Sequence, residues 1–377
     1  MLLIRTKSWC LCGALLVLTA LSLAAQPNTP FIQATDLTRI KQLGSVYLAP
    51  DGKKAVYAVT SIEPDADSPH EYKYVSHLHL TDFTPGAARV LTRGAESARQ
   101  PDWSPDSRAV AFVRTVKGKP QVFVLPLGGG EAWQLTNLKY GASSPKWSPD
   151  GKRILFAATP SFSEVLKDSL LNPGRGVPAW SLEKPGFRQN EQVKTGEKNA
   201  PSANPDGTLE EVRAYLQKNV DDKKARVVNR LNLQGEATVE PELEFSHLYV
   251  VEVREGASPR PLTRGFYAYT DGYWMPDGRR ILFAGAGDST VHPDRDLESR
   301  VYTMNADGTG RQLLLGEKGK EFAGFALSPD GKTLAFIRSA VGMSRPELGF
   351  LALADGKTTF VDHDRAVTTP GWTPDGK

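Results

Sequence analysis

The chain has only two cysteines among its 377 residues, Cys10 and Cys12, and both lie near its start. They fall in a segment with the form of a secretion signal, in which two bases precede an apolar run over 11–23 and small residues follow. We therefore expect residues 1–25 to be removed as a signal peptide. The mature chain would then have no disulfide, no thiolate nucleophile and no cysteine metal site.

The sequence also lacks a long apolar run and an excess of charge of one sign. The run over 11–23 is too short to span a bilayer, and polar residues follow it at once. We therefore expect no membrane span after signal removal, and a periplasmic or extracellular location. Removing the signal lowers the bases from 46 to 44 against 43 acids. A near-neutral surface argues against a nucleic-acid partner.

What the sequence has in abundance is one turn phrase, Trp/Leu-x-Pro-Asp-Gly-Lys/Arg, which occurs six times. Its prolines are Pro50, Pro105, Pro149, Pro276, Pro329 and Pro374. An aspartate follows each proline, a glycine follows in every copy but one, and a base ends the phrase. Proline fixes φ at the second turn position, aspartate can bond its own backbone, and glycine takes the positive φ that closes the loop. The phrase therefore predicts a β-hairpin.

A strand rich in apolar residues follows each of the first five phrases, with an aromatic residue seven positions after the proline. These aromatics are Tyr57, Phe112, Phe156, Phe283 and Phe336. A second apolar strand, a glycine turn and a polar strand ending in Leu-Thr complete a unit of four antiparallel strands. We expect the aromatics to be buried between neighbouring units, together with the residues two before each proline. The latter are Leu48, Trp103, Trp147, Trp274, Leu327 and Trp372.

Successive prolines lie 55, 44, 127, 53 and 45 residues apart. A four-stranded unit with a period near 45 is typical of a propeller blade, because such a unit cannot bury both of its faces alone. We therefore expect an all-β fold over residues 36–377, a β-propeller of four-stranded blades, seven in number and incomplete in its last blade. The 127-residue gap indicates either one blade with a long insertion or two degenerate blades. We favour some of each, since residues 226–231 look like a strand and much of 160–222 does not.

Several segments fall outside the repeat. Residues 26–35 are a polar linker, after which Asp36 can cap a short helix over 37–43. Residues 61–74 form an acidic, turn-rich excursion between two strands of the first unit. Residues 160–222 are an irregular insertion in which the spacing over 208–216 predicts a helix. Long insertions of this kind emerge at a rim of the fold, where they can reach a substrate or partner.

The turn phrase resembles that of TolB-like propellers, and three further segments are similar to the propellers of prolyl oligopeptidase-type serine peptidases. They are residues 36–41 leading into the first phrase, residues 121–136, and residues 225–231 followed by 247–253. The similarity is greatest to the acylaminoacyl peptidase and dipeptidyl aminopeptidase branch and covers residues 36–377. In that family the propeller precedes an α/β-hydrolase domain with a serine on a Gly-x-Ser-x-Gly elbow.

No Gly-x-Ser-x-Gly occurs in this sequence. The resemblance therefore implies the substrate-gating propeller of a secreted serine peptidase, a fragment that lacks the hydrolase domain and is inactive alone. Peptides would enter through the propeller opening, and no catalytic, cofactor or metal residue is expected in this chain. The alternative is a stand-alone TolB-like periplasmic binding propeller without enzymatic activity. A third reading, a propeller lyase, would need a His/Gln metal cluster.

Few residues suggest a site of their own. Dipeptidyl peptidases bind a substrate's free amino terminus with two propeller glutamates on a short helix, which makes Glu210 and Glu211 candidate substrate-binding residues. The structural alternative is that the helix dipole favours acids at a helix start. His77 and His79 share one strand face, as in some metal sites, but ordinary strand alternation explains them. The clusters around His292 and His363 have the composition of charged connections between blades.

Overall fold

The computed structural model describes most of the chain from residue 33 onward. The described residues are 33–65, 70–84, 88–182, 202–224, 242–286, 291–342 and 345–363, with Ser68, Val228, Arg230, Gln234, Arg365, Val367, 370–373, Asp375 and Gly376. The expected signal peptide and most of the expected strand at 226–231 lie outside them. The chain divides into two compact units, of which the smaller contains residues up to Gln42 together with 60–75 and the larger contains the rest.

Five four-stranded sheets make up the described fold, and in each sheet the strands are hydrogen-bonded in chain order. The first sheet consists of β1 (Gln42–Leu48), β2 (Ala55–Pro64), β3 (Tyr72–Thr81) and β4 (Arg89–Val90). The second consists of β5 (Ala98–Trp103), β6 (Ala109–Val116), β7 (Lys119–Pro126) and β8 (Trp133–Gln134). The third is β9 (Ser143–Trp147), β10 (Arg153–Ala158), β11 (His247–Glu252), β12 (Arg260–Pro261). The fourth consists of β13 (Tyr269–Trp274), β14 (Arg280–Ala286), β15 (Ser299–Asn305) and β16 (Gln312–Leu315). The fifth consists of β17 (Lys320–Leu327), β18 (Thr333–Ala340), β19 (Glu347–Ala352) and β20 (Thr358–Val361).

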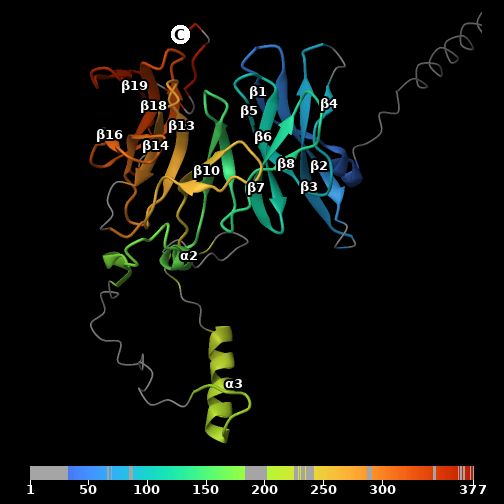
Figure 1. Cartoon of the computed structure of the whole chain (residues 1–377), viewed down its shortest axis with the longest axis vertical. Helices are drawn as coiled ribbons and strands as arrows, with labels where there is room; N and C mark the ends of the chain where they lie inside the picture. Colours follow the sequence, from blue (N-terminus) through green and yellow to red (C-terminus); the bar gives the residue numbers. More distant parts are fainter. Residues whose placement is uncertain are drawn as a thin grey trace, which may run out of the picture. The chain divides into compact units, whose positions relative to one another are not determined.

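This arrangement confirms the all-β class and the four-stranded antiparallel unit. Each of the first five turn phrases joins the first strand of a sheet to the second. Consecutive sheets from the second to the fifth pack against one another, β5 against β9, β10 against β13 and β15 against β17 (Figure 1). The expected number of seven blades stays a prediction, because the described residues contain five complete sheets.

The turn phrase owes its rigidity to the serine that precedes the proline in several copies. In the third sheet the Ser148 hydroxyl donates to Asp150 Oδ1 at 2.5 Å, and the same oxygen accepts the Lys152 N–H at 3.1 Å. The serine oxygen in turn accepts the Arg153 N–H at 2.9 Å. Gly151 adopts a φ of +69°, the conformation that favours glycine. The serine bond, followed by the lysine backbone bond, holds the pKa of Asp150 below its usual value although burial opposes it.

The aromatic residue seven positions after the proline is buried, as predicted, in four of the first five copies. Phe112, Phe156, Phe283 and Phe336 are at most 1% exposed, whereas Tyr57 is half-buried and stacks on His79. Three of the four buried rings also stack on an aromatic residue of the third strand, with centroids 5.6–5.7 Å apart. These rings form the centre of each sheet's core.

The prediction for the residues two before each proline is confirmed only in part. Trp103 and Trp274 are 7% and 9% exposed, and each indole donates across to the preceding sheet, to Tyr47 O and Lys146 O respectively. Leu48, which is 65% exposed, does not follow the prediction. The physical reason is its place in the repeat, because no described sheet precedes β1 to cover it.

The 127-residue gap contains a single sheet with an insertion among the described residues. β10 ends at Ala158 and β11 begins at His247, and the two strands pair directly from Arg153 with Glu252 to Ala158 with His247. The insertion contains α2 (Phe162–Lys167), η2 (Ala179–Leu182) and α3 (Leu209–Lys224) (Figure 1). The described residues thus contain the long insertion, whereas most of the segment expected to belong to a degenerate blade lies outside them. The helix predicted over 208–216 is confirmed.

Two local predictions near the start of the fold need correction. The helix expected over 37–43 is a 3-10 helix, η1 (Ala34–Arg39), and Asp36 lies inside it, where its carboxylate accepts the Gln33 N–H at 2.9 Å. The residues after it form β1, which pairs with β2 at the edge of the first sheet. The turn-rich excursion expected over 61–74 is shorter than predicted, since β2 extends to Pro64 and β3 begins at Tyr72.

Candidate functional site

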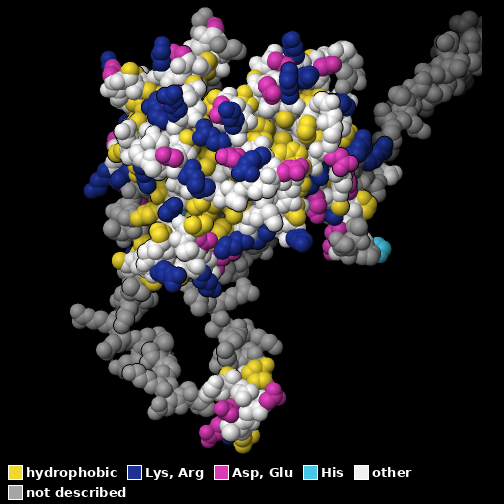
Figure 2. Space-filling view, in the orientation of Figure 1, with side chains coloured by type: hydrophobic (Ala, Val, Ile, Leu, Met, Phe, Trp, Pro, Cys, Tyr) yellow, Lys and Arg dark blue, Asp and Glu magenta, His cyan; other side chains and the backbone are white. Residues whose placement is uncertain are grey.

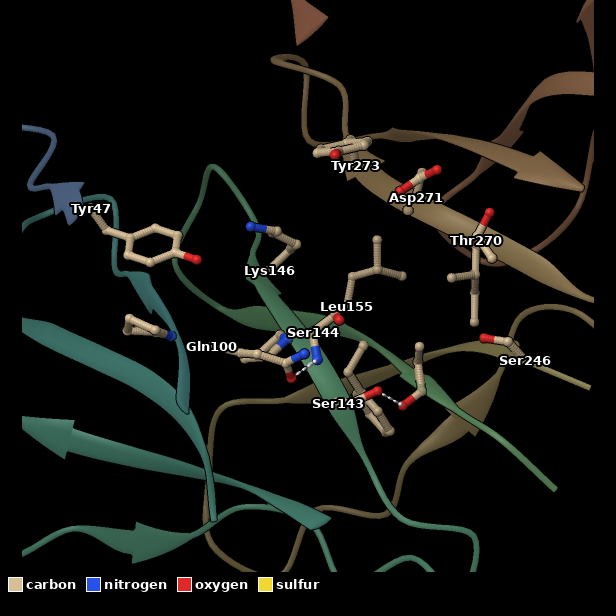
Figure 3. Close-up of a pocket in the computed structure, with 16 residues that line it drawn as sticks. Tyr47, Gln100, Ser143, Ser144, Lys146, Leu155, Ser246, Thr270, Asp271 and Tyr273 are labelled. Atoms are coloured by element: carbon tan, nitrogen blue, oxygen red, sulfur yellow. Dashed lines mark hydrogen bonds between the residues drawn. The ribbon is translucent and has the colours of Figure 1, made fainter. Parts of the chain in front are cut away.

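The first strands of four sheets enclose a cavity of about 390 Å³ in the larger unit (Figure 3). Tyr47 of β1, Gln100 of β5, Ser144 and Lys146 of β9, and Asp271 of β13 contribute to its walls. We call it the first-strand cavity. Its volume lies in the range of about 300–1,000 Å³ that is usual for ligand sites.

A bulge in three of these strands, β5, β9 and β13, puts a polar residue on the cavity wall. The pairing register shifts in β5, β9, β13 and β17, and the residue five before the turn proline takes a left-handed backbone. Its φ is +53° at Gln100, +51° at Ser144 and +52° at Asp271, and +61° at Gly324 of the fifth sheet. For most residues other than glycine this conformation costs about 1–2 kcal/mol, and aspartate tolerates it better than glutamine or serine does. Bulges that re-aim side chains are common beside functional sites.

One side of the first-strand cavity is held by hydrogen bonds between the second and third sheets. Gln100 Oε1 accepts the Ser144 N–H at 2.9 Å. Asp102 accepts the Trp147 N–H at 2.7 Å and lies 3.3 Å from Lys146 Nζ. Burial raises the pKa of the Asp102 carboxyl, and the charge of Lys146 opposes that shift. The ammonium of Lys146 is thus balanced by a carboxylate of the neighbouring sheet.

The opposite side is formed by β13. Solvent reaches Asp271, yet the cavity walls desolvate its carboxyl and raise its pKa, against a hydrogen bond with Thr270. Tyr273 lies beside it, and burial, followed by the charge of Asp271, raises the pKa of this phenol. Figure 3 shows Asp271 and Tyr273 on the same strand, with Lys146 and Tyr47 on strands of other sheets around the cavity. The cavity therefore offers one acid, one ion pair and neutral hydrogen-bonding groups.

The structure places the two candidate glutamates on α3, at its first turn. Glu211 closes a capping box with Thr208: its carboxylate accepts the Thr208 N–H at 2.7 Å, and the Glu211 N–H lies 3.4 Å from the Thr208 hydroxyl. Glu210 is exposed. Acidic and apolar side chains are both visible on α3 in Figure 2. A helix-start role accounts for Glu211, and substrate binding by the pair stays a prediction.

The histidines singled out in the sequence are not brought together. His79 stacks on Tyr57 at 5.5 Å, and His292 contacts Trp180 edge-on at 4.9 Å. His363 accepts the N–H of Arg365 at 3.0 Å within its own loop. Among the described residues no three histidine, cysteine, aspartate or glutamate side chains gather as a metal site would require. No described helix is long and apolar enough to cross a membrane.

The cavity residues Gln100, Ser144 and Asp271 were missed by sequence reasoning. Their signal is positional: each stands five residues before a turn proline, and aligning the phrases would have placed a polar residue there in three of the four bulged strands. The conformation that makes the position special depends on pairing between strands, which the phrase alone does not reveal.

Known proteins resemble this chain in part of its sequence and in its fold. No family model matches the chain. A segment of 111 residues, 29% of the chain, is 32% identical to the uncharacterised peptidase YuxL of Bacillus subtilis and spans 16% of that relative. The Pyrococcus horikoshii acylaminoacyl peptidase shares the fold over 89% of this chain and 42% of its own, with a TM-score of 0.52 and 15% identity.

The fold is a β-propeller. An oligogalacturonate lyase solved with manganese shares it over 89% of this chain and 70% of its own, with a TM-score of 0.54 and 13% identity. The likeness to solved structures shows the fold, and the sequence match to a peptidase confirms the resemblance inferred from the turn phrases and blade segments. The chain spans well under half the length of the peptidases that it matches.

Proposed function

We propose that this chain is the substrate-gating propeller of a secreted prolyl oligopeptidase-type serine peptidase. The observation that carries the proposal is the first-strand cavity, to which four successive sheets of a peptidase-like propeller contribute side chains. A peptide can reach into such a cavity with a few residues, whereas a folded protein cannot. Size selection of this kind needs no chemistry from the propeller itself.

The chemistry would belong to an α/β-hydrolase domain that works with the propeller. Its serine would attack the scissile carbonyl, its histidine would take and return the proton, and backbone amides would hold the oxyanion. The acyl group would pass from peptide to serine and then to water. The propeller's part is to choose which peptides reach that serine.

The mixed surface is compatible with a peptide substrate. Lysine and arginine are interspersed with aspartate and glutamate over the sheets on the face that Figure 2 shows. We include secretion in the proposal because residues 1–25 have the composition of a signal peptide. A peptidase outside the cytoplasm would meet unfolded peptides rather than nucleic acid.

The test compares residues 26–377 with the full reading frame that contains them. Both are assayed on acylated peptides and on peptides with a free amino terminus, in preparations checked for host peptidases. We expect turnover by the full reading frame and none by residues 26–377 alone. Turnover by residues 26–377, or none by the full reading frame on any peptide, would contradict the proposal; peptide binding without turnover would favour a TolB-like binding propeller.

A further inference from the structure

Three residues on the wall of the first-strand cavity stand at the same position of the repeat, five before a turn proline, and have a left-handed backbone that glycine would adopt without strain. Gln100, Ser144 and Asp271 share a left-handed backbone, and Gly324 takes the same conformation in the fifth sheet. The backbone of the bulge therefore does not require a side chain at this position. Keeping an amide, a hydroxyl and a carboxyl at strained positions that face one cavity indicates that the side chains have a use there.

The three side chains differ in their remaining binding capacity. Gln100 already bonds the backbone of Ser144 through its oxygen. Asp271 brings a charge, and the cation nearest to it in the cavity wall, Lys146, forms its ion pair with Asp102 at 3.3 Å. Within the described residues no ion pair includes Asp271. One lysine against two aspartates leaves these three side chains with a net negative charge.

The carboxylate of Asp271 is also partly desolvated. Its pKa is raised because the cavity walls remove water from the charged form. A charge in this state gains from a cation that enters the cavity and replaces the lost hydration. Tyr47 and Tyr273 stand across the cavity from each other and would flank a bound chain.

We propose that Asp271 selects the substrate by binding a primary ammonium group of the incoming peptide, either its amino terminus or a lysine side chain. This inference rests on the proposed function, since it names the substrate class that the gate admits. Gln100 and Ser144 hold the neutral side of the cavity and do not discriminate by charge. Asp271 is a specificity-determining residue and takes no part in bond cleavage.

The test measures peptide binding to the mature chain by calorimetry, without hydrolysis. The probes are tetraglycine amide, its N-acetylated form, and N-acetylated pentapeptide amides with lysine or glutamine between glycines. We expect the two ammonium peptides to bind at least about tenfold more tightly than their neutral counterparts, as for one charge-assisted hydrogen bond. A preference confined to tetraglycine amide assigns the amino terminus, and one confined to the lysine peptide assigns the side chain; either supports the proposal.

Asp271→Asn and Asp271→Gly should each remove that preference. Asparagine tolerates the left-handed backbone, and glycine already occupies the equivalent position at Gly324, so both variants should fold, as circular dichroism would verify. Glu252→Gln removes one negative charge from the exposed end of β11 and should leave the preference unchanged. Equal binding of charged and neutral peptides by the wild type would overturn the proposal, as would an unchanged preference in the Asp271 variants.

The two proposals can fail separately. Peptide turnover by the full reading frame without an ammonium preference would reject only the role of Asp271. An ammonium preference lost in Asp271→Asn, with no turnover of any peptide by the full reading frame, would reject only the peptidase function.

Discussion

At the scale of the residue, the phenylalanine that follows a turn phrase is among the largest fully buried side chains of the protein. Phe156 is 1% exposed and stacks on Tyr249 of the third strand at 5.6 Å. Its fixed distance from the proline places it opposite the same strand in every unit. The ring is therefore part of the same motif as the turn.

Replacing Phe156 by alanine should lower the free energy of unfolding by about 3–5 kcal/mol, because the cavity left in the core cannot collapse fully. Phe83→Ala is the matched control, since Phe83 is 55% exposed in a turn after β3. Urea unfolding of both variants measures the difference. A loss for Phe156→Ala as small as that for Phe83→Ala would remove the basis of the repeat assignment.

A glycine opposite one of these rings makes a second residue-scale prediction. Gly349 pairs with Phe336, and a Cβ at Gly349 would lie 2.4 Å from the ring. Gly349→Ala should therefore destabilise the chain by about 1–3 kcal/mol through overpacking. Gly128→Ala, where a Cβ would meet no atom within 4 Å, should be neutral or slightly stabilising. Thermal unfolding of the two variants tests this, and equal midpoints would contradict it.

At the scale of the element, the threonine of the Leu-Thr that ends each of the first three sheets accepts a backbone N–H of the third strand. Thr136 Oγ1 accepts the Val122 N–H and donates to Gln121 Oε1. In the third sheet Thr263 Oγ1 accepts the Leu248 N–H and lies 3.2 Å from His247 Nδ1. A glutamine and a histidine thus occupy the same position in two sheets.

The equivalence of His247 and Gln121 gives a prediction about how the stability of the fold depends on pH. Burial lowers the pKa of His247 to about 4, so its neutral form stabilises the fold fully above the ordinary value near 6.5. As the pH falls from 6.5 through 4, the unfolded chain binds the proton first and stability is lost. The loss approaches about 3 kcal/mol from this group alone.

His247→Gln, which copies Gln121, should remove that loss while keeping a partner for the threonine. Urea unfolding at pH 7 and pH 4 measures it, and the difference between the two proteins cancels the other groups. Four aspartates of the turn phrases have lowered pKa values, so their contribution is lost only below about pH 4; they are Asp106, Asp150, Asp277 and Asp330. The same pH dependence in both proteins would contradict the prediction.

Much of the secondary structure could be predicted from the sequence, since the residues of the turn phrase favour a hairpin by themselves. The four-strand unit, the buried aromatics and the helix after Thr208 all depend on local spacing. The exposure of Leu48, the length of β2 and the bulges at Gln100 and Asp271 depend on which strands lie alongside, and no local spacing reveals that. The cavity was therefore missed although its residues stand at a regular position.

At the scale of the whole molecule, the sheets are joined by tryptophan indoles. Trp103, Trp274 and Trp372 each donate from Nε1 to a backbone carbonyl of the preceding sheet, at 2.9–3.0 Å. Trp147 occupies the same position, but its Nε1 has no partner among the described residues. Tryptophan at this position therefore makes the hydrogen bond to the preceding sheet in three copies, but Trp147 does not.

Trp274→Phe should destabilise the chain by about 1–3 kcal/mol more than Trp147→Phe, because it also leaves the Lys146 carbonyl without its donor. Both changes remove a similar area of ring, which makes the second variant a control for packing. Chemical denaturation measures the two losses. A larger loss for Trp147→Phe would show that the indole bonds do not hold the sheets together.

The central claim is that the first-strand cavity controls which peptides reach a catalytic serine. Ser246, which lines the cavity, can be replaced by tryptophan to narrow it. The most direct measurement is kcat/KM of the full reading frame, with and without Ser246→Trp, on a short chromogenic acyl-amino acid and on a long peptide with the same cleavage residue. We expect a loss of at least about tenfold for the long peptide and little change for the short substrate. An equal effect on both substrates, at an unchanged melting temperature, would contradict the account.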